Sequence, residues 1–408
     1  MFGSRQNVSG SGCTPGSWRR NALDSKIEPP VQRTIARTRN RFLVTEGKLS
    51  KNTSNPVVVG ITSPLELDYV EQIRAAAPGR IEVRYEPDLL PPAQYVADHH
   101  GPADWQRSTA DQARWEALLT ECEIVWDIPE VSWDTPGAAT KPVLELMPNL
   151  RWIQTTSAGV GPMITSLGLA ETDIIVTTSS GIHAKPLAEF AFAVMLNWVK
   201  EFPRLQKDQK AHRWARYCAG ELDGRTLTVV GPGRIGREVG RLGKAFGMHT
   251  IAIASRADGS RTSSPEFDEI FDRSGLHAAL GRSDFVVLST PHTPDTENLI
   301  DAAAIAAMKP GIVLVNIARG IVIDEDAMLA ALRSGHIAFA GLDVFRTEPL
   351  PADSPFWDLP NVLVVPHSAS TAWNENQRIT DIFVRNIPLY LDGRFDEMSP
   401  LLDKRRGY

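Results

Sequence analysis

The chain has 408 residues, 42% of them hydrophobic and 23% charged, which indicates a globular protein of two domains and excludes collagen-like and largely disordered chains. Only three cysteines occur, far apart in the sequence, which excludes a disulfide scaffold and favours a reducing compartment, so we expect a cytoplasmic protein. The longest apolar run, at 187–199, is too short for a bilayer and the net charge is −6, so we expect neither a membrane nor a nucleic acid as a partner.

Residues 1–54 differ in composition from the rest of the chain. Residues 1–52 hold 10 Lys and Arg against 3 Asp and Glu, a charge of +7, whereas the remaining residues carry −13. The arginines recur without an apolar face, so we interpret residues 1–54 as a disordered N-terminal extension. A start codon assigned too far upstream and an Arg-rich organelle transit peptide are the alternatives.

Residues 55–180 alternate apolar runs with helical patterns. Pro56–Ile61 is a short run with three valines that predicts a buried strand, and Leu65–Ala76 has the spacing of a helix. Further strands are predicted at Ile81–Tyr85, Cys122–Trp126 and Trp152–Thr155, with a long loop at 86–112. Strands that alternate with helices form parallel sheets, so the predicted fold class is α/β.

A second α/β block begins at residue 181. Pro186–Val199 is apolar on nearly every side and predicts a buried helix, and Ile235–Phe246 predicts another. Short strands are predicted at Leu227–Val230, His249–Ala254, Phe285–Ser289, Ile312–Asn316, Ala338–Leu342 and Val362–Val365, and a last helix at Asn376–Leu391. We expect two parallel-sheet domains: a substrate domain of residues 55–180, completed by 370–402, and a nucleotide-binding domain of residues 181–369.

A GxGxxG motif lies between a strand and a helix of the second block. Gly231 is expected to make the tight turn, Gly233 to let the backbone approach a pyrophosphate, and Gly236 to let helix and strand pack closely. Arg234 and Ile235 open the helix, whose N-terminus attracts an anion through its free amides. This context predicts a Rossmann domain that binds a dinucleotide.

The sequence Ala254-Ser255-Arg256 ends the second strand of that domain, where an Asp or Glu usually binds the ribose 2′-hydroxyl. No acidic residue occurs there before Asp258. Ser255 and Arg256 can instead bind a 2′-phosphate, because a guanidinium forms paired hydrogen bonds with phosphate oxygens. We therefore expect NADP to be preferred over NAD. The alternative is that Arg256 is an ordinary surface arginine.

Three further segments place polar residues after predicted strands. They are VNIARGIVID at 315–324, GLDVFRTEPLP at 341–351 and VVPHSA at 364–369. Ligands of open α/β sheets bind beyond the carboxyl ends of the strands, so Arg319, Glu348 and His367 are expected to meet there. His367 can act as an acid at neutral pH, Glu348 can orient and stabilise its imidazolium, and Arg319 can bind a carboxylate.

The motifs GPGRIG, VNIARG, GLDVFRTEPLP and VPHSAS, in this order, resemble those of the D-isomer-specific 2-hydroxyacid dehydrogenase family, and within it those of glyoxylate/hydroxypyruvate reductases. The resemblance covers residues 56–400. It implies that Arg319, Glu348 and His367 are catalytic and that the substrate domain is flavodoxin-like. It also implies a homodimer, with the apolar helix Pro186–Val199 at the two-fold interface.

The same resemblance implies which residues bind ligands. The substrate carboxylate is expected on Ala158, Gly159 and Val160, together with Arg319. Besides the glycine loop with Ser255 and Arg256, cofactor contacts are implied for Thr290, Pro291, Thr296, Ile317, Ala318, Arg319, Asp343 and His367. The run Asp98-His99-His100 lacks further ligands at metal spacing, so no metal is expected.

Together these residues predict an NAD(P)-dependent enzyme that interconverts a 2-keto acid, such as glyoxylate or hydroxypyruvate, and a D-2-hydroxy acid by hydride transfer. One alternative is a family enzyme acting on 3-phosphoglycerate or a bulkier keto acid. Another is a dinucleotide-sensing binding protein that resembles the transcriptional corepressors of this fold. Turnover on a panel of keto acids distinguishes the enzymes from the sensor.

Overall fold

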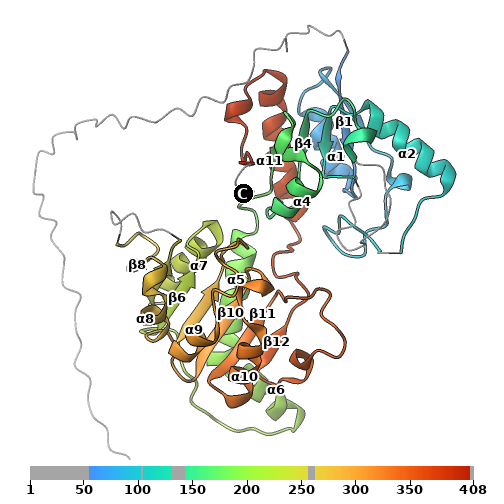
Figure 1. Ribbon diagram of the computed structural model, residues 1–408. Coiled ribbons are helices and arrows are strands. Elements are labelled where there is room, and N and C mark those ends of the chain that lie inside the picture. Colours follow the sequence, from blue (N-terminus) through green and yellow to red (C-terminus); the bar gives the residue numbers. More distant parts are fainter. Residues whose placement is uncertain (1–54, 103, 130–142, 256–261, 405–408) are drawn as a thin grey trace, which may run out of the picture. The chain divides into compact units, whose positions relative to one another are not determined.

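A computed structural model describes residues 55–102, 104–129, 143–255 and 262–404. Within them the chain forms two sheets of parallel strands, each flanked by helices (Figure 1). The α/β class predicted from the sequence is confirmed. The predicted extension at residues 1–54, and Arg256, lie outside the described residues.

The first sheet has the strand order β2-β1-β3-β4-β5. Its strands are β1 (Val57–Ile61), β2 (Ile81–Arg84), β3 (Ile124–Trp126), β4 (Trp152–Gln154) and β5 (Ile175–Thr177). In its register Val57 pairs with Ile81 and Val59 with Ile124. This is the strand order of flavodoxin-like folds, whose ligands bind where the order reverses, between the first and third strands.

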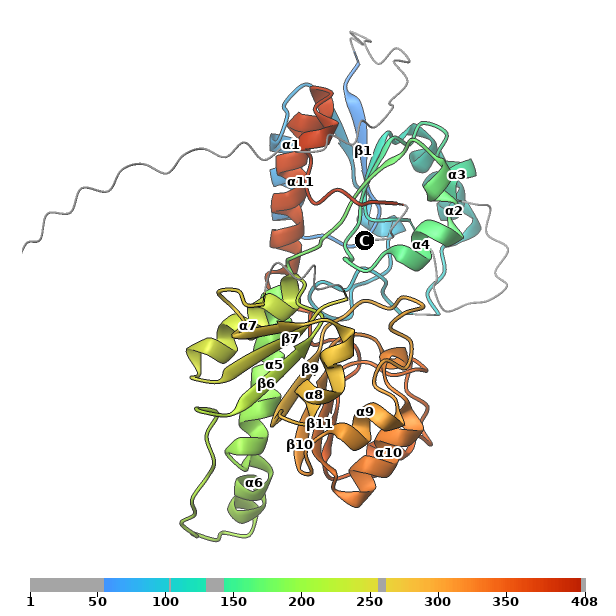
Figure 2. The same ribbon diagram turned by 60° about the vertical axis from the view of Figure 1, so that its left-hand side comes forward.

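Helices cover both faces of the first sheet. They are α1 (Leu67–Ala75), α2 (Thr109–Glu121), α3 (Val143–Leu146), α4 (Gly161–Ser166) and α11 (Glu375–Leu391). Although α11 comes from the end of the chain, it packs beside α1 (Figure 2). The ring of its Phe383 lies 5.7 Å from that of Trp126 and 4.9 Å from that of Trp152. Residues that follow the second sheet therefore complete the core of the first.

The second sheet has the order β12-β11-β10-β9-β6-β7-β8. Its strands are β6 (Thr226–Val230), β7 (His249–Ile253), β8 (Glu269–Phe271), β9 (Phe285–Leu288), β10 (Ile312–Asn316), β11 (Ile337–Leu342) and β12 (Val362–Val364). From β8 to β11 this is the Rossmann order 3-2-1-4-5-6, and β12 adds a seventh strand. Leu227 of β6 pairs with Phe285 of β9, so the glycine loop after β6 lies where the strand order reverses.

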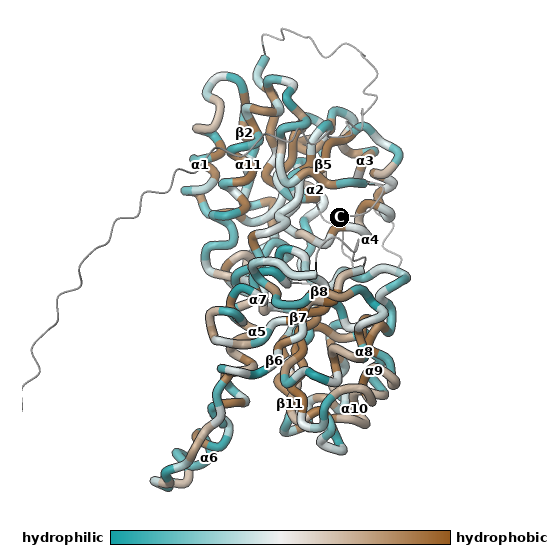
Figure 3. Tube along the Cα trace, turned by 90° about the vertical axis from the view of Figure 1, so that its left-hand side faces the viewer, coloured by the Kyte–Doolittle hydropathy of each residue, from teal (hydrophilic) through white to brown (hydrophobic). Residues whose placement is uncertain are grey.

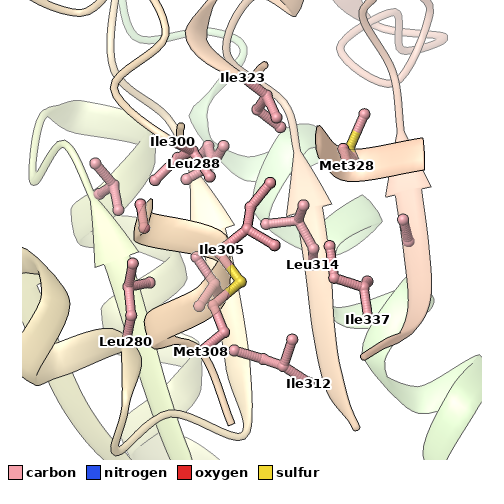
Figure 4. Close-up of a cluster of buried hydrophobic side chains, with 14 of the residues drawn as sticks. Leu280, Leu288, Ile300, Ile305, Met308, Ile312, Leu314, Ile323, Met328 and Ile337 are labelled. Carbon is pink, nitrogen blue, oxygen red and sulfur yellow. The ribbon is translucent and has the colours of Figure 1, made fainter. Parts of the chain in front are cut away.

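Two layers of helices enclose the second sheet. They are α5 (Ala184–Val199) and α7 (Arg234–Ala245), and then α8 (Leu276–Leu280), α9 (Ala302–Ala307) and α10 (Glu325–Ser334). The helix α6 (Phe202–Lys210) follows α5 and extends beyond the sheet (Figure 2). Side chains of α5 and α7 share one core cluster, and those of α8, α9 and α10 share another on the opposite face (Figure 2). In the second cluster Leu314 of β10 lies between Ile305 and Ile337 (Figure 4).

The inner strands of the second sheet are nearly continuous apolar runs, because both of their faces are buried. All five residues of β10 are buried, for example, and the trace is brown along β6, β7 and β11 (Figure 3). Single-turn 3-10 helices add η1 (Pro87–Leu89), η2 (Leu169–Glu171), η3 (Arg273–Gly275), η4 (Gly320–Val322), η5 (Pro355–Asp358) and η6 (Phe395–Glu397). None of the helices in the described part of the chain has the length and apolar character needed to cross a membrane.

The strands and helices that the sequence predicts are confirmed to within two residues, but several helices, among them α2, α6 and α10, and some shorter elements are not predicted. The prediction of one long loop over 86–112 is wrong at its ends, since η1 follows β2 and α2 begins at Thr109. Ser108 caps α2 by accepting a hydrogen bond from the amide of Asp111. The sequence does not predict β5 or β8, because three residues are too few to show a period.

Candidate active site

Three neighbouring strands of the second sheet end at one edge with polar residues. β10 ends at Asn316, Asp343 follows β11, and β12 leads into His367. The amide of Asp343 donates to the carbonyl of Asn316, and the amide of His367 donates to the carbonyl of Asp343, each over 3.0 Å. Backbone hydrogen bonds thus bring the segments of Arg319 and His367 together.

His367 and Glu348 form a direct pair. Nδ1 of His367 lies 2.7 Å from Oε2 of Glu348, and Oε1 of Glu348 accepts a hydrogen bond of 2.8 Å from the amide of Phe345. Burial alone would raise the pKa of Glu348, but these hydrogen bonds and the charge of Arg319 hold it below its ordinary value. Glu348 is therefore an anion at neutral pH. Nε2 of His367 is then the nitrogen available for proton transfer, on a side chain that is 44% exposed.

Arg319 lies between this pair and the predicted substrate loop. Burial lowers the pKa of its guanidinium, although the charges of Glu348 and Asp343 oppose that shift; the group is still a cation at neutral pH. Its Nη1 donates to the carbonyl of Ala318 over 2.7 Å. On the other side, a Cβ added to Gly159 would lie 2.5 Å from Nη2. The loop after β4 and the cation after β10 therefore lie next to each other, and their shared contact with a substrate carboxylate remains a prediction.

The predicted substrate loop joins β4 to α4. The hydroxyl of Thr156 donates to Oδ1 of Asp127 over 3.1 Å, which ties the loop to the end of the neighbouring strand β3. Gly159 is exposed, Ala158 is half-buried, and Val160 is buried in the core. The structure thus brings Gly159 to Arg319. The contacts of Ala158 and Val160 with a substrate remain predictions.

Each of the three glycines after β6 has a different environment. Gly231 has a φ of +95°, and a Cβ there would lie 2.9 Å from backbone atoms of Thr290. A Cβ on Gly236 would lie 2.2 Å from the carbonyl oxygen of Gly231, whereas one on Gly233 would meet no atom within 4 Å. Gly231 thus lies in a turn, Gly233 faces open space and Gly236 packs closely, which is the arrangement expected for binding a dinucleotide pyrophosphate. These residues fit such a cofactor.

Arg234 and Ile235 begin α7, whose free amides are the groups offered to a phosphate. Nη1 of Arg234 donates to the carbonyl of Ser180, and the guanidinium lies over Gly181, which has a φ of +105°. The Arg234 side chain is therefore engaged within the protein. The sequence does not indicate this contact, because its partner lies 54 residues away. Ile235 packs against the core cluster that α5 and α7 share.

The segment after β9 is braced by Thr296. Its Oγ1 donates to the carbonyl of Pro291 over 2.8 Å and accepts from the amide of Thr293 over 2.7 Å. The buried Thr290 contacts the turn at Gly231. Thr296 therefore gives this loop its shape, and the contacts of Thr290 and Pro291 with a cofactor remain predictions.

The other residues implied for the cofactor flank the same edge of the sheet. Ile317 and Ala318 are buried directly after β10, and Ser255 is exposed two residues after the end of β7. Arg256, on which the NADP preference depends, lies outside the described residues. The 2′-phosphate contact of Ser255 and Arg256 therefore remains a prediction.

Two buried polar residues have structural partners that the sequence does not indicate. Oδ1 of Asp343 accepts hydrogen bonds from the amides of Ser368 and Ala369, over 2.8 and 2.9 Å. Oδ1 of Asn316 accepts from the amide of Ala318 over 3.0 Å, and Nδ2 donates to the carbonyl of Arg319 over 3.2 Å. The sequence shows a polar residue at the end of each apolar strand. This pattern predicts that the residue lies at the edge of the sheet, but it does not predict the hydrogen-bond partner.

Comparisons with known proteins point in one direction. A family model described as "D-isomer specific 2-hydroxyacid dehydrogenase, NAD binding domain" matches residues 192–369. D-3-phosphoglycerate dehydrogenase of Mycobacterium leprae is 34% identical over 317 residues, which cover 72% of this chain and 58% of that protein. Glyoxylate/hydroxypyruvate reductase B of Pectobacterium atrosepticum is 33% identical over 269 residues, which cover 64% of this chain and 82% of that protein.

A solved structure agrees with these sequence comparisons. The crystal structure of a D-isomer specific 2-hydroxyacid dehydrogenase from Xanthobacter autotrophicus, in complex with NADPH and MES, matches with a TM-score of 0.65 at 27% identity. The match covers 87% of this chain and all of that one. By contrast, the chain spans only 51–58% of the length of the phosphoglycerate dehydrogenases to which it is similar.

Proposed function

The chain belongs to the D-isomer specific 2-hydroxyacid dehydrogenase family, and on this basis we propose that it reduces a small 2-keto acid to the D-2-hydroxy acid with a nicotinamide cofactor. Glyoxylate and hydroxypyruvate are the proposed substrates. The 2.7 Å contact between His367 and Glu348, beside the Arg319 cation, carries the proposal. A proton donor, a carboxylate that orients it and a cation for the substrate carboxylate are the groups that this reduction needs.

Reduction adds a hydride to the carbonyl carbon and a proton to its oxygen. A bound reduced nicotinamide supplies the hydride. The proton comes from Nε2 of His367, since Nδ1 faces Glu348. The Glu348 carboxylate stabilises the imidazolium before transfer. Arg319 pairs with the substrate carboxylate and polarises the keto oxygen, next to the backbone of Gly159.

The test is a panel of 2-keto acids assayed with the purified full-length chain and each reduced cofactor. We expect saturable turnover of glyoxylate or hydroxypyruvate, and a D-configured product identified by chiral chromatography. Tight binding of reduced cofactor without turnover of any panel member would favour the dinucleotide-sensing alternative instead. His277 is an exposed histidine on α8, so the His277→Asn variant is the matched control for histidine substitutions.

A second candidate is oxidation of D-3-phosphoglycerate. The 34% identity to the Mycobacterium leprae enzyme favours it. The assay therefore includes 3-phosphoglycerate with oxidised cofactor, and phenylpyruvate as a bulky keto acid. The ratio of kcat/KM values across the panel ranks these substrates, and a higher value for 3-phosphoglycerate than for either small acid would replace the leading proposal.

The preferred cofactor is proposed to be NADP(H). No carboxylate stands at Ala254 or Ser255 to bind a 2′-hydroxyl or repel a 2′-phosphate, and Arg256 follows. The relative from Xanthobacter autotrophicus binds NADPH. We expect kcat/KM to favour NADPH over NADH by roughly tenfold or more. A charge-assisted hydrogen bond to phosphate contributes about 1.5–3 kcal/mol, whereas a neutral contact contributes about 1 kcal/mol. A difference of about 1.4 kcal/mol corresponds to a factor of ten.

The double variant Ala254→Asp/Arg256→Ala tests the cofactor proposal. It adds repulsion against a 2′-phosphate and a partner for a 2′-hydroxyl, so the preference should reverse. The variant Arg333→Ala, at an exposed position on α10, is the control and should keep the original ratio. A wild-type chain that prefers NADH would contradict the proposed role of Arg256.

We propose that the protein is a cytoplasmic homodimer with two domains per chain. Residues 55–180 with 370–402 form the substrate domain, and residues 181–369 form the cofactor domain. The packing of α11 on the first sheet supports this division. The free thiols of Cys122 and Cys218 agree with a reducing compartment.

A further inference from the structure

The turn that carries His367 has an unusual backbone conformation. His367 has a φ of +50°, in the left-handed region that residues other than glycine rarely adopt. Such a conformation persists only where the surrounding structure holds it. The amide of His367 is held by two carbonyls, those of Asp343 and Val365, over 3.0 and 3.1 Å.

The side chain of Asp343 holds the two residues that follow. It is 2% exposed, and its Oδ1 accepts from the amides of both Ser368 and Ala369. Three consecutive amides, from His367 to Ala369, therefore donate to one residue at the end of β11. A carboxylate that accepts two adjacent amides forms charge-assisted hydrogen bonds, so the buried side chain of Asp343 favours this particular turn.

The neighbouring strand holds the Arg319 turn in the same manner. Asn316, the last residue of β10, is 1% exposed and bonds through its side chain to Ala318 and Arg319. Its carbonyl also accepts from the amide of Asp343. The segments of Arg319 and His367 are thus each hydrogen-bonded to a buried polar residue, Asn316 or Asp343, at the carboxyl edge of the sheet.

We propose that Asp343 is a positioning residue for the reaction: by holding the backbone from His367 to Ala369, it keeps the His367 imidazole in contact with Glu348. This role differs from the cofactor contact that the family resemblance implies for Asp343, and it rests on the proposed function of His367. A general acid works only in the correct orientation, and a displacement of about 1 Å can lower the rate by about 10²-fold.

The test compares Asp343→Ala with Asp343→Asn. Alanine removes the acceptor, whereas asparagine keeps one acceptor oxygen, removes the charge and replaces the other oxygen with an NH2 group. For the alanine variant we expect kcat to fall on the order of 10²-fold, with the dissociation constant for NADPH, measured by fluorescence, within about threefold of wild type. The asparagine variant should recover at least tenfold of the lost kcat.

The control is Asp284→Ala at the opposite edge of the same sheet. Oδ2 of Asp284 accepts from the amide of Thr226 over 2.8 Å, so this variant also removes a carboxylate from a backbone amide. It should lower Tm without lowering kcat more than twofold. If Asp343→Ala fails to fold, Ser368→Pro removes one of the two amide donors at an exposed position and should lower kcat by roughly tenfold.

A readout independent of turnover is the crystal structure of Asp343→Ala without cofactor, in which the contact of His367 with Glu348 should be lost. An alanine variant with normal kcat and weakened NADPH binding would overturn the proposal, as would an asparagine variant as impaired as alanine. If the wild type reduces no keto acid, the proposed function fails, and the crystal structure alone then decides whether Asp343 holds His367.

Discussion

His367 and Glu348 occupy different environments although they touch. The histidine is solvent-accessible, so a substrate can reach it, while Glu348 receives hydrogen bonds from both His367 and the Phe345 amide. These bonds keep the carboxylate ionised below its ordinary pKa. The pair therefore combines a mobile proton on one residue with a fixed negative charge on the other, and each half can be tested separately.

Substitution of His367 tests the proton donor. His367→Asn should lower kcat on the order of 10²–10⁴-fold, the usual contribution of a positioned general acid. The dissociation constant for NADPH, measured by fluorescence titration, should change by less than about threefold, because the glycine loop lies on β6 and α7. Turnover near the wild-type value in this variant, with His277→Asn as control, would contradict the assignment.

Substitution of Glu348 tests the fixed charge through the pH dependence. Glutamine cannot stabilise the imidazolium, so the protonated donor persists only to a lower pH. In the direction of reduction, activity is present below the midpoint of the pH–rate profile and is lost as pH rises through it. For Glu348→Gln this midpoint should move to lower pH. A profile of kcat/KM against pH that matches wild type would count against the pair.

At the scale of elements, the junction of β6 with α7 depends on glycine for two separate reasons. Gly236 has no room for a side chain, since a Cβ would meet the backbone oxygen of Gly231 at 2.2 Å. Gly233 faces open space in the protein alone. Gly236 therefore lets α7 pack closely on β6, whereas the proposed role of Gly233 is to leave room for a bound dinucleotide.

The variants Gly236→Ala and Gly233→Ala should therefore differ. Gly236→Ala forces α7 away from β6 and should destabilise the protein by roughly 1–3 kcal/mol, seen as a lower Tm. Gly233→Ala should keep Tm within about a degree or two and weaken NADPH binding by roughly tenfold, since its Cβ would occupy the approach of the pyrophosphate. Equal loss of Tm in the two variants would contradict this division of roles.

At the scale of the whole molecule, the helix α5 is less available for a partner than its sequence suggests. Seven of its residues, among them Leu187, Phe192 and Met195, are buried in the core of their own domain. The large apolar side chains that are most exposed lie at its end, where Trp198 is 38% exposed and Phe202, at the start of α6, is 45% exposed. This end of α5 is the part that a second copy can cover.

The homodimer prediction follows from that surface. Light scattering at micromolar concentration should give about twice the chain mass of 44.8 kDa. Phe202→Glu should shift the mass toward the monomer, because a charge in an apolar interface is not solvated. Trp357→Glu, at a residue 50% exposed on η5, should leave the mass unchanged. A wild-type monomer would contradict the prediction.

The amino-acid sequence by itself determined the features that depend on neighbours along the chain. Continuous apolar runs such as Ile312–Asn316 predict buried parallel strands, and the GxGxxG motif predicts its own turn, because each signal is local. The placement of Arg319, Glu348 and His367 at one edge of the sheet was predictable, because each follows a strand and the carboxyl ends of parallel strands share one edge.

Only the tertiary structure decided the contacts that join distant segments. The return of α11 to the first sheet, the contact of Gly159 with Arg319 and the hydrogen bonds from Asp343 to the His367 turn all join residues far apart in sequence. No periodicity or local motif encodes such partners, because burial and backbone hydrogen bonding are satisfied only once the sheets are assembled. The residue types therefore indicated the chemistry of the proposed site, whereas the assembly of the sheets determined which residues contact one another.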